Sequence, residues 1–427
     1  MTPSLKKSLF LTALAVAVGL ASVPSFAADT PITQFTPGDL VVLRGGDDAN
    51  SATAATQVSL YLDEYTTGGA YVGTINVPSS GGSPLTLPGT GDFQHEGILS
   101  LSSNGQYLSF AGYQASAGSA DAFVQPGASQ YQAVIGIIGN SAASLATNTV
   151  VNAYGPNSSN PYIRGAVSND GTQFWTFGKY ASSGATSNGG LSYVSGTGPS
   201  ATTSTVEGWA DWRDIVIGGN GQLYGGTGSS SVGNHAPYVV DNTVNATTHQ
   251  LNTPLTLPTA NLTNNLALNT QLGAYPGGQS ASALAFLDLP GDPNSQNGLN
   301  VMYTIGDQST PGIVKYYFDG TTWQNQTDVA LNTTNVANPT GLFAVQDSGN
   351  PNWVDITVTG TNGLYTFVDT SGYNGAILAN AFTLAASPRT ANEAFFGVAL
   401  APVAVPEPAS LAVLALAGAG LLLRRRR

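Results

Sequence analysis

The stretch that decides the fold is Arg164-Gly-Ala-Val-Ser168, followed after one residue by Asp170-Gly-Thr-Gln-Phe-Trp175. Short runs with β-branched or aromatic residues stand on both sides of an Asp-Gly pair, and such residues are enriched in β-strands. Asp-Gly favours a type I′ hairpin turn, in which both central residues have positive φ. We therefore expect a strand, a type I′ turn and a second strand that opens with an aromatic residue.

The same pattern recurs along the chain, closely in two places and more loosely in two others, and a half-copy without a partner ends the series. These copies are Glu96-Gly-Ile-Leu-Ser with Asn104-Gly-Gln-Tyr-Leu-Ser-Phe, Arg213-Asp-Ile-Val-Ile with Asn220-Gly-Gln-Leu-Tyr, Ser282-Ala-Leu-Ala-Phe-Leu with Asn297-Gly-Leu-Asn-Val-Met-Tyr, Thr340-Gly-Leu-Phe-Ala-Val with Asn362-Gly-Leu-Tyr, and the half-copy Glu393-Ala-Phe-Phe-Gly-Val-Ala-Leu. Sustained helical periodicity is absent between the two chain ends. The body of the protein is therefore predicted to be all-β.

The spacing of the copies predicts the architecture. They begin roughly 50 to 70 residues apart, which leaves room for two further strands in each interval. A four-stranded unit repeated at that spacing is typical of a β-propeller, so a propeller-like fold of six blades is expected. The long polar intervals 114–160 and 230–280 leave a seventh blade open. A pair of β-sandwiches and a β-helix are the alternative folds.

The half-copy predicts how the ring closes. Its missing partner strands are present at the other end of the chain, in Asp39-Leu-Val-Val-Leu, Val58-Ser-Leu-Tyr-Leu and Tyr71-Val-Gly-Thr-Ile-Asn-Val. One blade is then shared between the N- and C-terminal strands, which removes sheet edges that otherwise favour aggregation. We expect the strand near Phe395–Leu400 to pair with the strand at Leu40–Leu43.

The composition bounds the classes of function. Only 8% of the residues are charged, 52 are glycine and none is cysteine, so disulfides and thiol chemistry are excluded. The formal net charge is −12, and between residues 28 and 404 six basic residues stand against 23 acidic ones, a net charge of −17. An acidic surface disfavours nucleic acid, which needs basic patches. No nucleic-acid partner is therefore expected.

Residues 1–27 have the features of a secretory signal peptide. Lys6 and Lys7 form a positive region, Leu9 to Leu20 are largely apolar, and Ser25-Phe-Ala27 provides small residues at the cleavage position. The general secretion machinery and signal peptidase are therefore expected partners, with cleavage after Ala27.

The other end of the chain is also a candidate targeting segment. Pro406, Glu407 and Pro408 precede the apolar run Ala409–Leu423, and Arg424, Arg425, Arg426 and Arg427 end the chain. The 15-residue run predicts a short helix of roughly 22 Å, less than the ~30 Å hydrocarbon core of a bilayer. The arginines stay on the cytoplasmic face, while the prolines hold the preceding chain extended, accessible to a protease.

A Pro-Glu-Pro motif, an apolar segment and a basic cluster in this order resemble the PEP-CTERM sorting signal. That resemblance implies processing by an exosortase, transient anchoring in the inner membrane through the C-terminal helix, and delivery to the cell surface or extracellular matrix. It also implies a setting rich in exopolysaccharide. We accordingly divide the chain into a signal peptide (1–27), a propeller-like ectodomain (33–402) and a sorting and anchor segment (403–427).

Motifs for catalysis or metal binding are weak. His95, His235 and His249 are isolated, so no zinc site is expected, and residues 288–294 fit a surface turn better than a calcium loop. The sequence has no Gly-x-Ser-x-Gly elbow and no phosphate-binding loop, and no cofactor is expected.

The acidic pairs and the tryptophans have ordinary structural interpretations. Asp47-Asp48, Asp63-Glu64 and Asp211/Asp214 are adjacent or nearly so, whereas glycosidase acids face each other across a sugar. We interpret them as solvated turn residues. Trp175, Trp209, Trp212 and Trp323 could stack on sugars, but their placement within strands favours core packing.

Four charged residues form the one candidate binding site of the body. Glu96, Arg164, Arg213 and Glu393 occupy similar places at the starts of four expected inner strands, which surround one mouth of a propeller channel. Salt bridges between neighbouring blades are one interpretation, and a polar ligand site in the channel is the other.

Two hypotheses for function follow. The first is a non-catalytic exported module that binds exopolysaccharide or matrix proteins. The second is an extracellular propeller enzyme, a hydrolase or lyase acting on glycans, whose site is assembled from loops and lacks a sequence motif.

The sorting interpretation predicts a defect in processing. Glu407→Ala and deletion of Arg424–Arg427 each remove a recognition element, so both variants are expected to remain uncleaved and membrane-bound. Fractionation and immunoblotting measure this, and release equal to that of the wild type would contradict the sorting interpretation.

Overall fold

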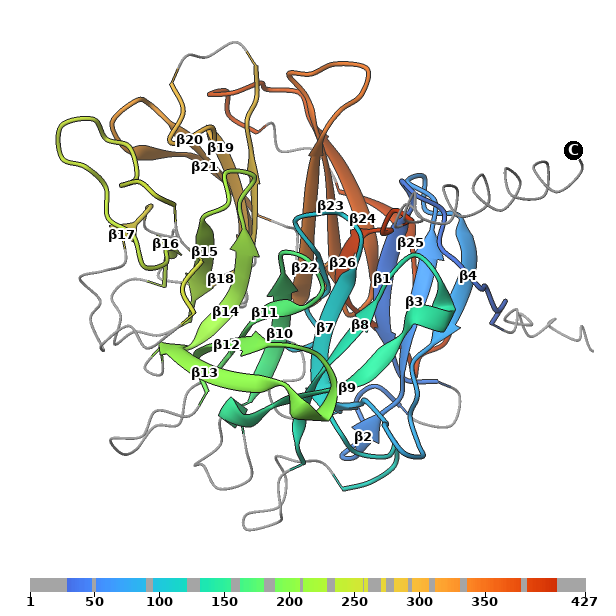
Figure 1. The fold of residues 1–427 in the computed structure, drawn as a ribbon. Coiled ribbons are helices and arrows are strands. Elements are labelled where there is room, and N and C mark those ends of the chain that lie inside the picture. Colours follow the sequence, from blue (N-terminus) through green and yellow to red (C-terminus); the bar gives the residue numbers. More distant parts are fainter. Residues whose placement is uncertain are drawn as a thin grey trace, which may run out of the picture.

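The computed structural model describes residues 29–404, apart from 48–50, 90–94, 121–130, 155–161, 180–188, 208–209, 229–234, 256, 260–269, 274–279, 291–293, 307–311, 331–335 and 378–381. The described residues form six four-stranded antiparallel sheets arranged around a common axis (Figure 1), and one small two-stranded sheet. The fold is therefore an all-β, six-bladed propeller, as the repeat spacing predicts. The described part of the chain holds no seventh four-stranded sheet. The expected C-terminal helix lies outside the described residues.

Five blades use four consecutive strands each, numbered from the inner strand outwards. The second blade consists of β6 (Ser100–Leu101), β7 (Leu108–Tyr113), β8 (Ala133–Ile138) and β9 (Ala146–Val151), and the third of β10 (Ile163–Ser168), β11 (Gln173–Gly178), β12 (Leu191–Ser195) and β13 (Thr202–Glu207). The fourth blade consists of β14 (Trp212–Ile217), β15 (Leu223–Thr227), β16 (Pro237–Val239) and β17 (Thr270–Gln271), and the fifth of β18 (Ala281–Leu287), β19 (Val301–Gly306), β20 (Gly312–Phe318) and β21 (Trp323–Ala330). The sixth blade consists of β22 (Pro339–Gln346), β23 (Val354–Gly360), β24 (Gly363–Asp369) and β25 (Thr383–Ala386).

Short elements complete the description. The two-stranded sheet pairs β2 (Gln57–Val58) with β5 (Leu87–Pro88), and the 3-10 helices are η2 (Ala142–Ser144), η3 (Asn152–Tyr154) and η4 (Gly198–Ser200). The polar intervals 114–160 and 230–280 supply outer strands of the second and fourth blades.

The closing blade joins the two ends of the propeller. It has the strand order β26 (Ala394–Leu400), β1 (Leu40–Gly45), β3 (Leu60–Tyr65) and β4 (Tyr71–Asn76). β26 and β1 are antiparallel, with Leu400 opposite Leu40 and Val398 opposite Val42. This confirms the predicted pairing of the orphan strand with the first strand of the body, and it excludes the sandwich and β-helix alternatives.

The predicted turn type is wrong at three of the first four hairpins. Gly105, Gly171 and Gly221 have positive φ, but the Asn or Asp that precedes each of them does not. Of these four hairpins, only the one at Asn297-Gly298 has positive φ at both turn residues. The reason is local hydrogen bonding. The Asp170 carboxylate accepts the amides of Thr172 and Gln173 at 2.8 and 3.0 Å, so its side chain caps the turn.

The fifth predicted hairpin is also assigned to the wrong strands. Asn362-Gly joins β23 to β24, the second and third strands of the sixth blade, whereas residues 347–353 connect β22 to β23. The copy beginning at Thr340 therefore matches the other copies in its inner strand alone.

The hydrophobic core consists of six clusters, one at each interface between neighbouring blades. Alternate residues of β1 serve two of them: Val41 and Leu43 pack towards the second blade, and Leu40 and Val42 towards the sixth. Trp175, Trp212 and Trp323 are buried between blades, which confirms the core interpretation for these three. Trp209 lies outside the described residues.

A β-bulge recurs in the inner strands of the blades. In β10, β14, β18 and β22 the register with the second strand shifts just before Gly165, Asp214, Ala283 and Gly341 respectively. The equivalent bulge of β26 falls at Phe396 and Gly397, and the Gly397 amide donates to the Gly97 carbonyl at 2.9 Å. We call the small residues Gly97, Gly165, Ala283, Gly341 and Gly397 the constriction.

The constriction predicts a strict size limit. A Cβ atom added to Gly397 would lie 2.1 Å from the Leu99 nitrogen, so Gly397→Ala forces backbone atoms apart. We expect a loss of about 3 kcal/mol in the free energy of unfolding, measured by urea denaturation. Gly82→Ala is the matched control, since nothing lies within 4 Å of its added Cβ. Equal stability of the two variants would contradict this packing.

Candidate functional site

Several predicted site residues lie outside the described residues: Ala27, Pro406, Glu407, Pro408 and Arg424 to Arg427. Their roles in signal cleavage and sorting stay predictions as far as structure is concerned. The candidate site is therefore built from the described residues of the channel and its mouths.

Arg164 and Arg213 meet at Asp211. Arg164 is fully buried in β10, and its Nη1 atom forms an ion pair with Oδ1 of Asp211. The Nη2 atom of Arg213 in β14 lies 3.3 Å from Oδ2 of the same carboxylate. Burial opposes ionisation of Asp211, but the two guanidinium groups hold the pKa of its carboxyl below the usual value. The third and fourth blades are thus joined by a charged bridge at the start of their inner strands.

His95 and Glu96 lie at the same mouth. Burial, together with the charges of Arg213 and Arg164, lowers the pKa of His95 to about 2, so this histidine is neutral at physiological pH. Glu96 is fully buried. The pKa of Tyr113 is raised, first by the burial of Tyr113 and then by the charge of Glu96. These two residues therefore belong to the electrostatic environment of Arg164.

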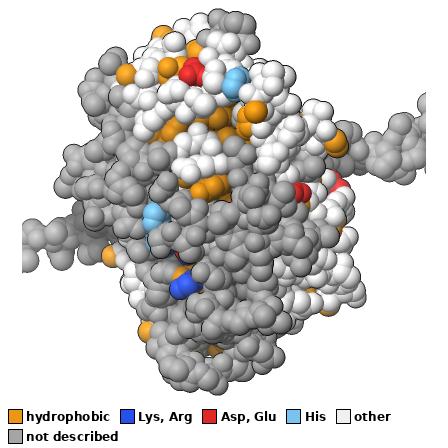
Figure 2. Space-filling view, turned by 90° about the vertical axis from the view of Figure 1, so that its left-hand side faces the viewer, with side chains coloured by type: hydrophobic (Ala, Val, Ile, Leu, Met, Phe, Trp, Pro, Cys, Tyr) orange, Lys and Arg blue, Asp and Glu red, His pale blue; other side chains and the backbone are white. Residues whose placement is uncertain are grey.

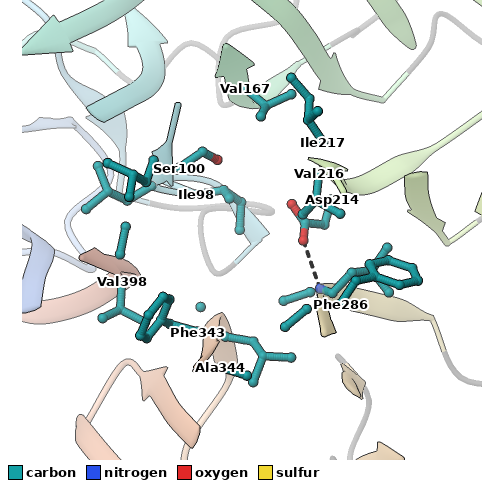
Figure 3. A pocket seen from close by; sticks show the side chains of 18 of the residues that line it. Ile98, Ser100, Val167, Asp214, Val216, Ile217, Phe286, Phe343, Ala344 and Val398 are labelled. Carbon is teal, nitrogen blue, oxygen red and sulfur yellow. Dashed lines mark hydrogen bonds between the residues drawn. The ribbon is translucent and has the colours of Figure 1, made fainter. Parts of the chain in front are cut away.

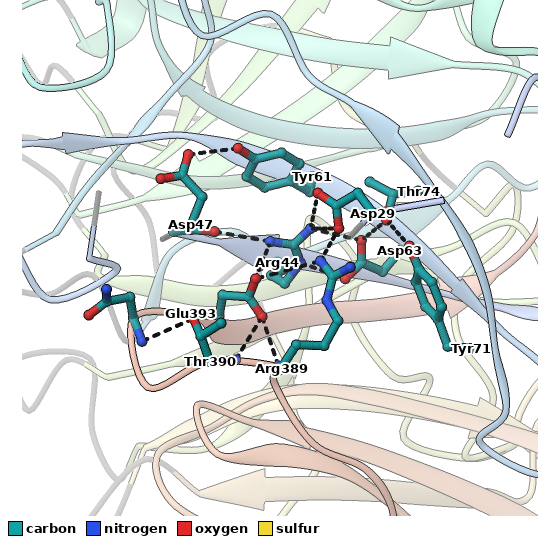
Figure 4. Close-up of polar contacts among 12 residues, drawn as sticks. Asp29, Arg44, Asp47, Tyr61, Asp63, Tyr71, Thr74, Arg389, Thr390 and Glu393 are labelled. Carbon is teal, nitrogen blue, oxygen red and sulfur yellow. Dashed lines mark hydrogen bonds and ion pairs between the residues drawn. The ribbon is translucent and has the colours of Figure 1, made fainter. Parts of the chain in front are cut away.

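Glu393 belongs to a second charged cluster, which closes the ring (Figure 4). It accepts a hydrogen bond from Arg44 Nη1 at 2.9 Å, while Arg44 Nε donates to Asp63 at 2.6 Å. Asp29 pairs with both Arg44 and Arg389. Arg44 is 1% exposed and stacks on the Tyr61 ring at 4.1 Å. The cluster ties the first described residues, β1 and β3 to the segment before β26.

The four predicted mouth residues are thus distributed between two clusters. Arg164 and Arg213 share Asp211, whereas the ion pairs of Glu393 are with Arg44 and Arg389. Glu393 lies three residues before Phe396, the bulge residue of β26. A ligand-binding role for these residues stays a prediction.

The interpretation of the acidic pairs as solvated turn residues is wrong for four of the six. Asp63 and Glu64 are fully buried on β3, Asp214 is 3% exposed on β14, and the Asp211 side chain is 14% exposed. Burial is tolerated because Asp63 and Asp211 have arginine partners, Glu64 accepts the Thr36 amide, and Asp214 accepts the Leu284 amide. Asp48 lies outside the described residues.

A cavity of about 220 Å³ occupies the channel beside the constriction (Figure 3). All six inner strands line it, largely with apolar side chains such as Ile98, Val167, Phe286, Phe343 and Val398. Of the described residues that line it, Asp214 is the only one with an ionisable side chain. The cavity is therefore an apolar chamber with a single acidic group.

Asp214 connects the fourth blade to the fifth. Its Oδ2 atom accepts the Leu284 amide at 2.9 Å, and in Figure 3 the carboxyl faces Ile98 across the cavity. Burial raises the pKa of Asp214 to about 7, against the opposing effect of the Leu284 and Ile215 amides. The Asp214 carboxyl therefore keeps its proton to a higher pH than an exposed aspartate does.

Sequence reasoning missed Asp214 although its signal is present. In the five aligned copies the second residue of the inner-strand segment is glycine or alanine in four cases and aspartate in one. These residues are Gly97, Gly165, Asp214, Ala283 and Gly341. An acid at a position that otherwise holds only small residues departs from the repeat. That departure marks the one blade whose inner strand places a carboxyl in the channel.

Other surfaces offer less chemistry. Figure 2 shows few charged side chains among the described residues of one face. Within the described ranges no three His, Asp or Glu side chains are arranged to hold a metal ion. Nor does any helix in the described part of the chain have the length and apolar character to cross a bilayer. Of the segment 288–294, residues 291–293 are not described.

The fold and channel define a six-bladed β-propeller, and comparison with known families adds the sorting class. Residues 404–427 match the family model described as the PEP-CTERM protein-sorting motif. The chain therefore carries a PEP-CTERM sorting motif, which marks an exported protein sorted by an exosortase and anchored through its C-terminal segment during sorting. No curated protein gives a match.

Three solved structures illustrate what this chain is similar to. A putative 6-phosphogluconolactonase from Bacteroides fragilis is 12% identical, with a TM-score of 0.44 over 81% of this chain and 82% of that one. The Cps50 (Swd1) β-propeller domain from Myceliophteria thermophila is 10% identical, with a TM-score of 0.36 over 83% and 90%. A periplasmic gluconolactonase from Pseudomonas aeruginosa is 12% identical, with a TM-score of 0.38 over 77% and 78%. Similarities at this level assign no activity to this chain.

The mouth cluster predicts unequal effects of two arginine substitutions. Arg164 is fully buried and Arg213 is partly exposed, so Arg164→Ala is expected to lower the free energy of unfolding by about 3 kcal/mol and Arg213→Ala by much less. Urea denaturation measures both. Unchanged stability with weaker retention of an extracellular partner would instead indicate a ligand site, and no effect on either property would leave the cluster without a role.

Asp214 predicts a pH-dependent difference in stability. The unfolded carboxyl loses its proton near pH 4 and the folded one near pH 7, so folding becomes less favourable as the pH rises between these values. Asp214→Asn removes this penalty, and wild type is expected to lose about 4 kcal/mol relative to the variant between pH 4 and pH 8. Urea denaturation across this range measures the difference. A difference that does not vary with pH would contradict the assignment.

Proposed function

We propose that this protein is a non-catalytic binding module of the cell surface or extracellular matrix. Its sorting motif directs it through transient anchoring in the inner membrane, and an exopolysaccharide-rich setting is the expected destination. Exopolysaccharide and matrix proteins are the classes of partner. The observation that carries this proposal is the character of the channel cavity, which presents one carboxyl on an otherwise uncharged lining.

The cavity argues for binding rather than glycan hydrolysis. Glycoside hydrolases generally place two carboxyl groups ~5–9 Å apart on either side of the scissile bond. Asp214 is the only acidic residue among the described residues that line the cavity, so it has no partner for acid–base catalysis there. Its Oδ2 atom already accepts a hydrogen bond from the Leu284 amide. The nearby charges at the channel mouth are engaged in bridges between blades, as Asp211 is by Arg164 and Arg213. An enzyme acting on glycans is therefore the less favoured candidate.

The test is recovery of the mature protein with its native extracellular material. We expect a component of that material to remain bound through washing and to be released unchanged when the protein is unfolded, as judged by mass spectrometry and glycan analysis. Protein unfolded before incubation is the control. Time-dependent cleavage of the component would contradict the proposal in favour of an enzyme, and retention equal to that of the unfolded control would contradict it outright.

A further inference from the structure

We propose that the channel cavity binds a small primary amine with an apolar body, whose ammonium group pairs with Asp214. This inference rests on the proposed binding function and names a ligand class for it. It follows from the size of the cavity, the position of its single acid and the aromatic residues beside it.

The position of Asp214 is unlike that of its counterparts in the repeat. Gly165, Ala283 and Gly341 follow the same bulge in other blades. A Cβ atom added to Gly165 would lie 3.0 Å from the Ile98 Cβ, and one added to Gly341 would lie 2.8 Å from the Val398 nitrogen. The fourth blade instead buries an aspartate at this position, which brings a desolvation cost that the other blades avoid. The Leu284 amide satisfies one oxygen of Asp214. A carboxyl that also lines an open cavity is suited to contact a ligand.

The residues that line the cavity favour a positively charged ligand. No lysine, arginine or histidine is present among the described residues that line the cavity, so a bound cation supplies the counter-charge that the cavity lacks. An ammonium within hydrogen-bonding distance of a buried carboxylate gains more than a neutral donor does. The chain is also strongly acidic, with a formal net charge of −12, which raises the local concentration of cations and disfavours anionic ligands.

The lining also selects for an apolar body. Phe286 and Phe343 border the cavity together with Ile98, Val216 and Val398 (Figure 3). Phe286 is held in place by Tyr224, with ring centroids 4.3 Å apart. A dry cavity of about 150 Å³ is enough to bind benzene, so about 220 Å³ accommodates a phenyl ring with an aminomethyl group. Benzylamine is therefore a suitable probe, and benzyl alcohol is its neutral isostere.

The pairing gives binding a pH dependence. The titratable residues on the strands packed against β14 are Arg164 on β10 and Tyr224 on β15, and β14 itself carries Arg213. None of these three lines the cavity. Burial raises the pKa of Asp214 to about 7, so a protonated amine binds more tightly as Asp214 ionises above that pH.

The experiment is isothermal titration calorimetry of the mature protein with benzylamine and benzyl alcohol. At pH 8 we expect benzylamine to bind at least about tenfold more tightly than benzyl alcohol, a preference that shrinks towards pH 5.5. Asp214→Asn is expected to abolish the preference. Equal affinities of the two compounds for the wild type, or an unchanged preference in Asp214→Asn, would overturn the proposal.

A second pair of variants tests the location without changing Asp214. Ala344 lines the cavity, and Ala344→Phe is expected to reduce benzylamine affinity at least about tenfold by filling it. Val345 is the next residue on β22, is 38% exposed, and does not line the cavity, so Val345→Phe is the control with unchanged affinity. Equal affinity in both variants would overturn the location.

The outcome is separable from that of the proposed function. A matrix component retained intact, without any benzylamine preference, would overturn the amine inference alone. Cleavage of that component would overturn the non-catalytic proposal whatever the amine result.

Discussion

The pairing of β1 with β26 is the constraint on which the rest of the structure depends. It joins residues about 350 positions apart, such as Val42 and Val398, and it turns six sheets into a closed ring. Without this pairing β26 would not belong to the closing blade, and the free edge of β1 could pair with another chain. The Arg44 cluster reinforces the same junction by linking Asp63 of β3 to Glu393 just before β26.

Ring closure also sets the geometry of the channel. Six inner strands around one axis must approach closely. Gly341 and Gly397 of the constriction allow this, because an added Cβ atom at either position would meet backbone atoms of a neighbouring blade. Asp214 is the exception to that packing. Its carboxyl is fixed by the Leu284 amide of the next blade, so the site is built on two rigid strands. The cavity beside it is a product of the same closure.

The sparse charges of the body have mainly structural partners. Arg44, Arg164, Arg213, Lys315 and Arg389 all form ion pairs. Lys315 of the fifth blade pairs with Asp369 of the sixth at 2.8 Å, both buried. Buried pairs of this kind give little net stability, but breaking one leaves an uncompensated charge. They favour one arrangement of the blades, and Asp214 is left as the acid of the channel.

The sequence predicts the fold well because each blade carries the same local pattern. The repeated copies of a strand, a turn and a second strand identify the blades, and the half-copy at Glu393 identifies the closing strand. The turn type was not predictable from Asn-Gly and Asp-Gly pairs, because the Asp170 side chain bonds to its own turn. Adjacency in sequence gave no indication that Asp63 and Asp214 are buried, since their partners come from distant residues. The bulge of β26 likewise shifts Glu393 away from the place that alignment gives it.

The most direct measurement of ring closure is native-state hydrogen exchange of the backbone amides in β1 and β26. If their pairing closes the propeller, the hydrogen-bonded amides of Leu40–Gly45 and Ala394–Leu400 exchange only through global unfolding. Their protection then equals that of buried strands such as β7 and β19. Faster exchange of β1 and β26 through local opening, with the other blades still protected, would contradict the account.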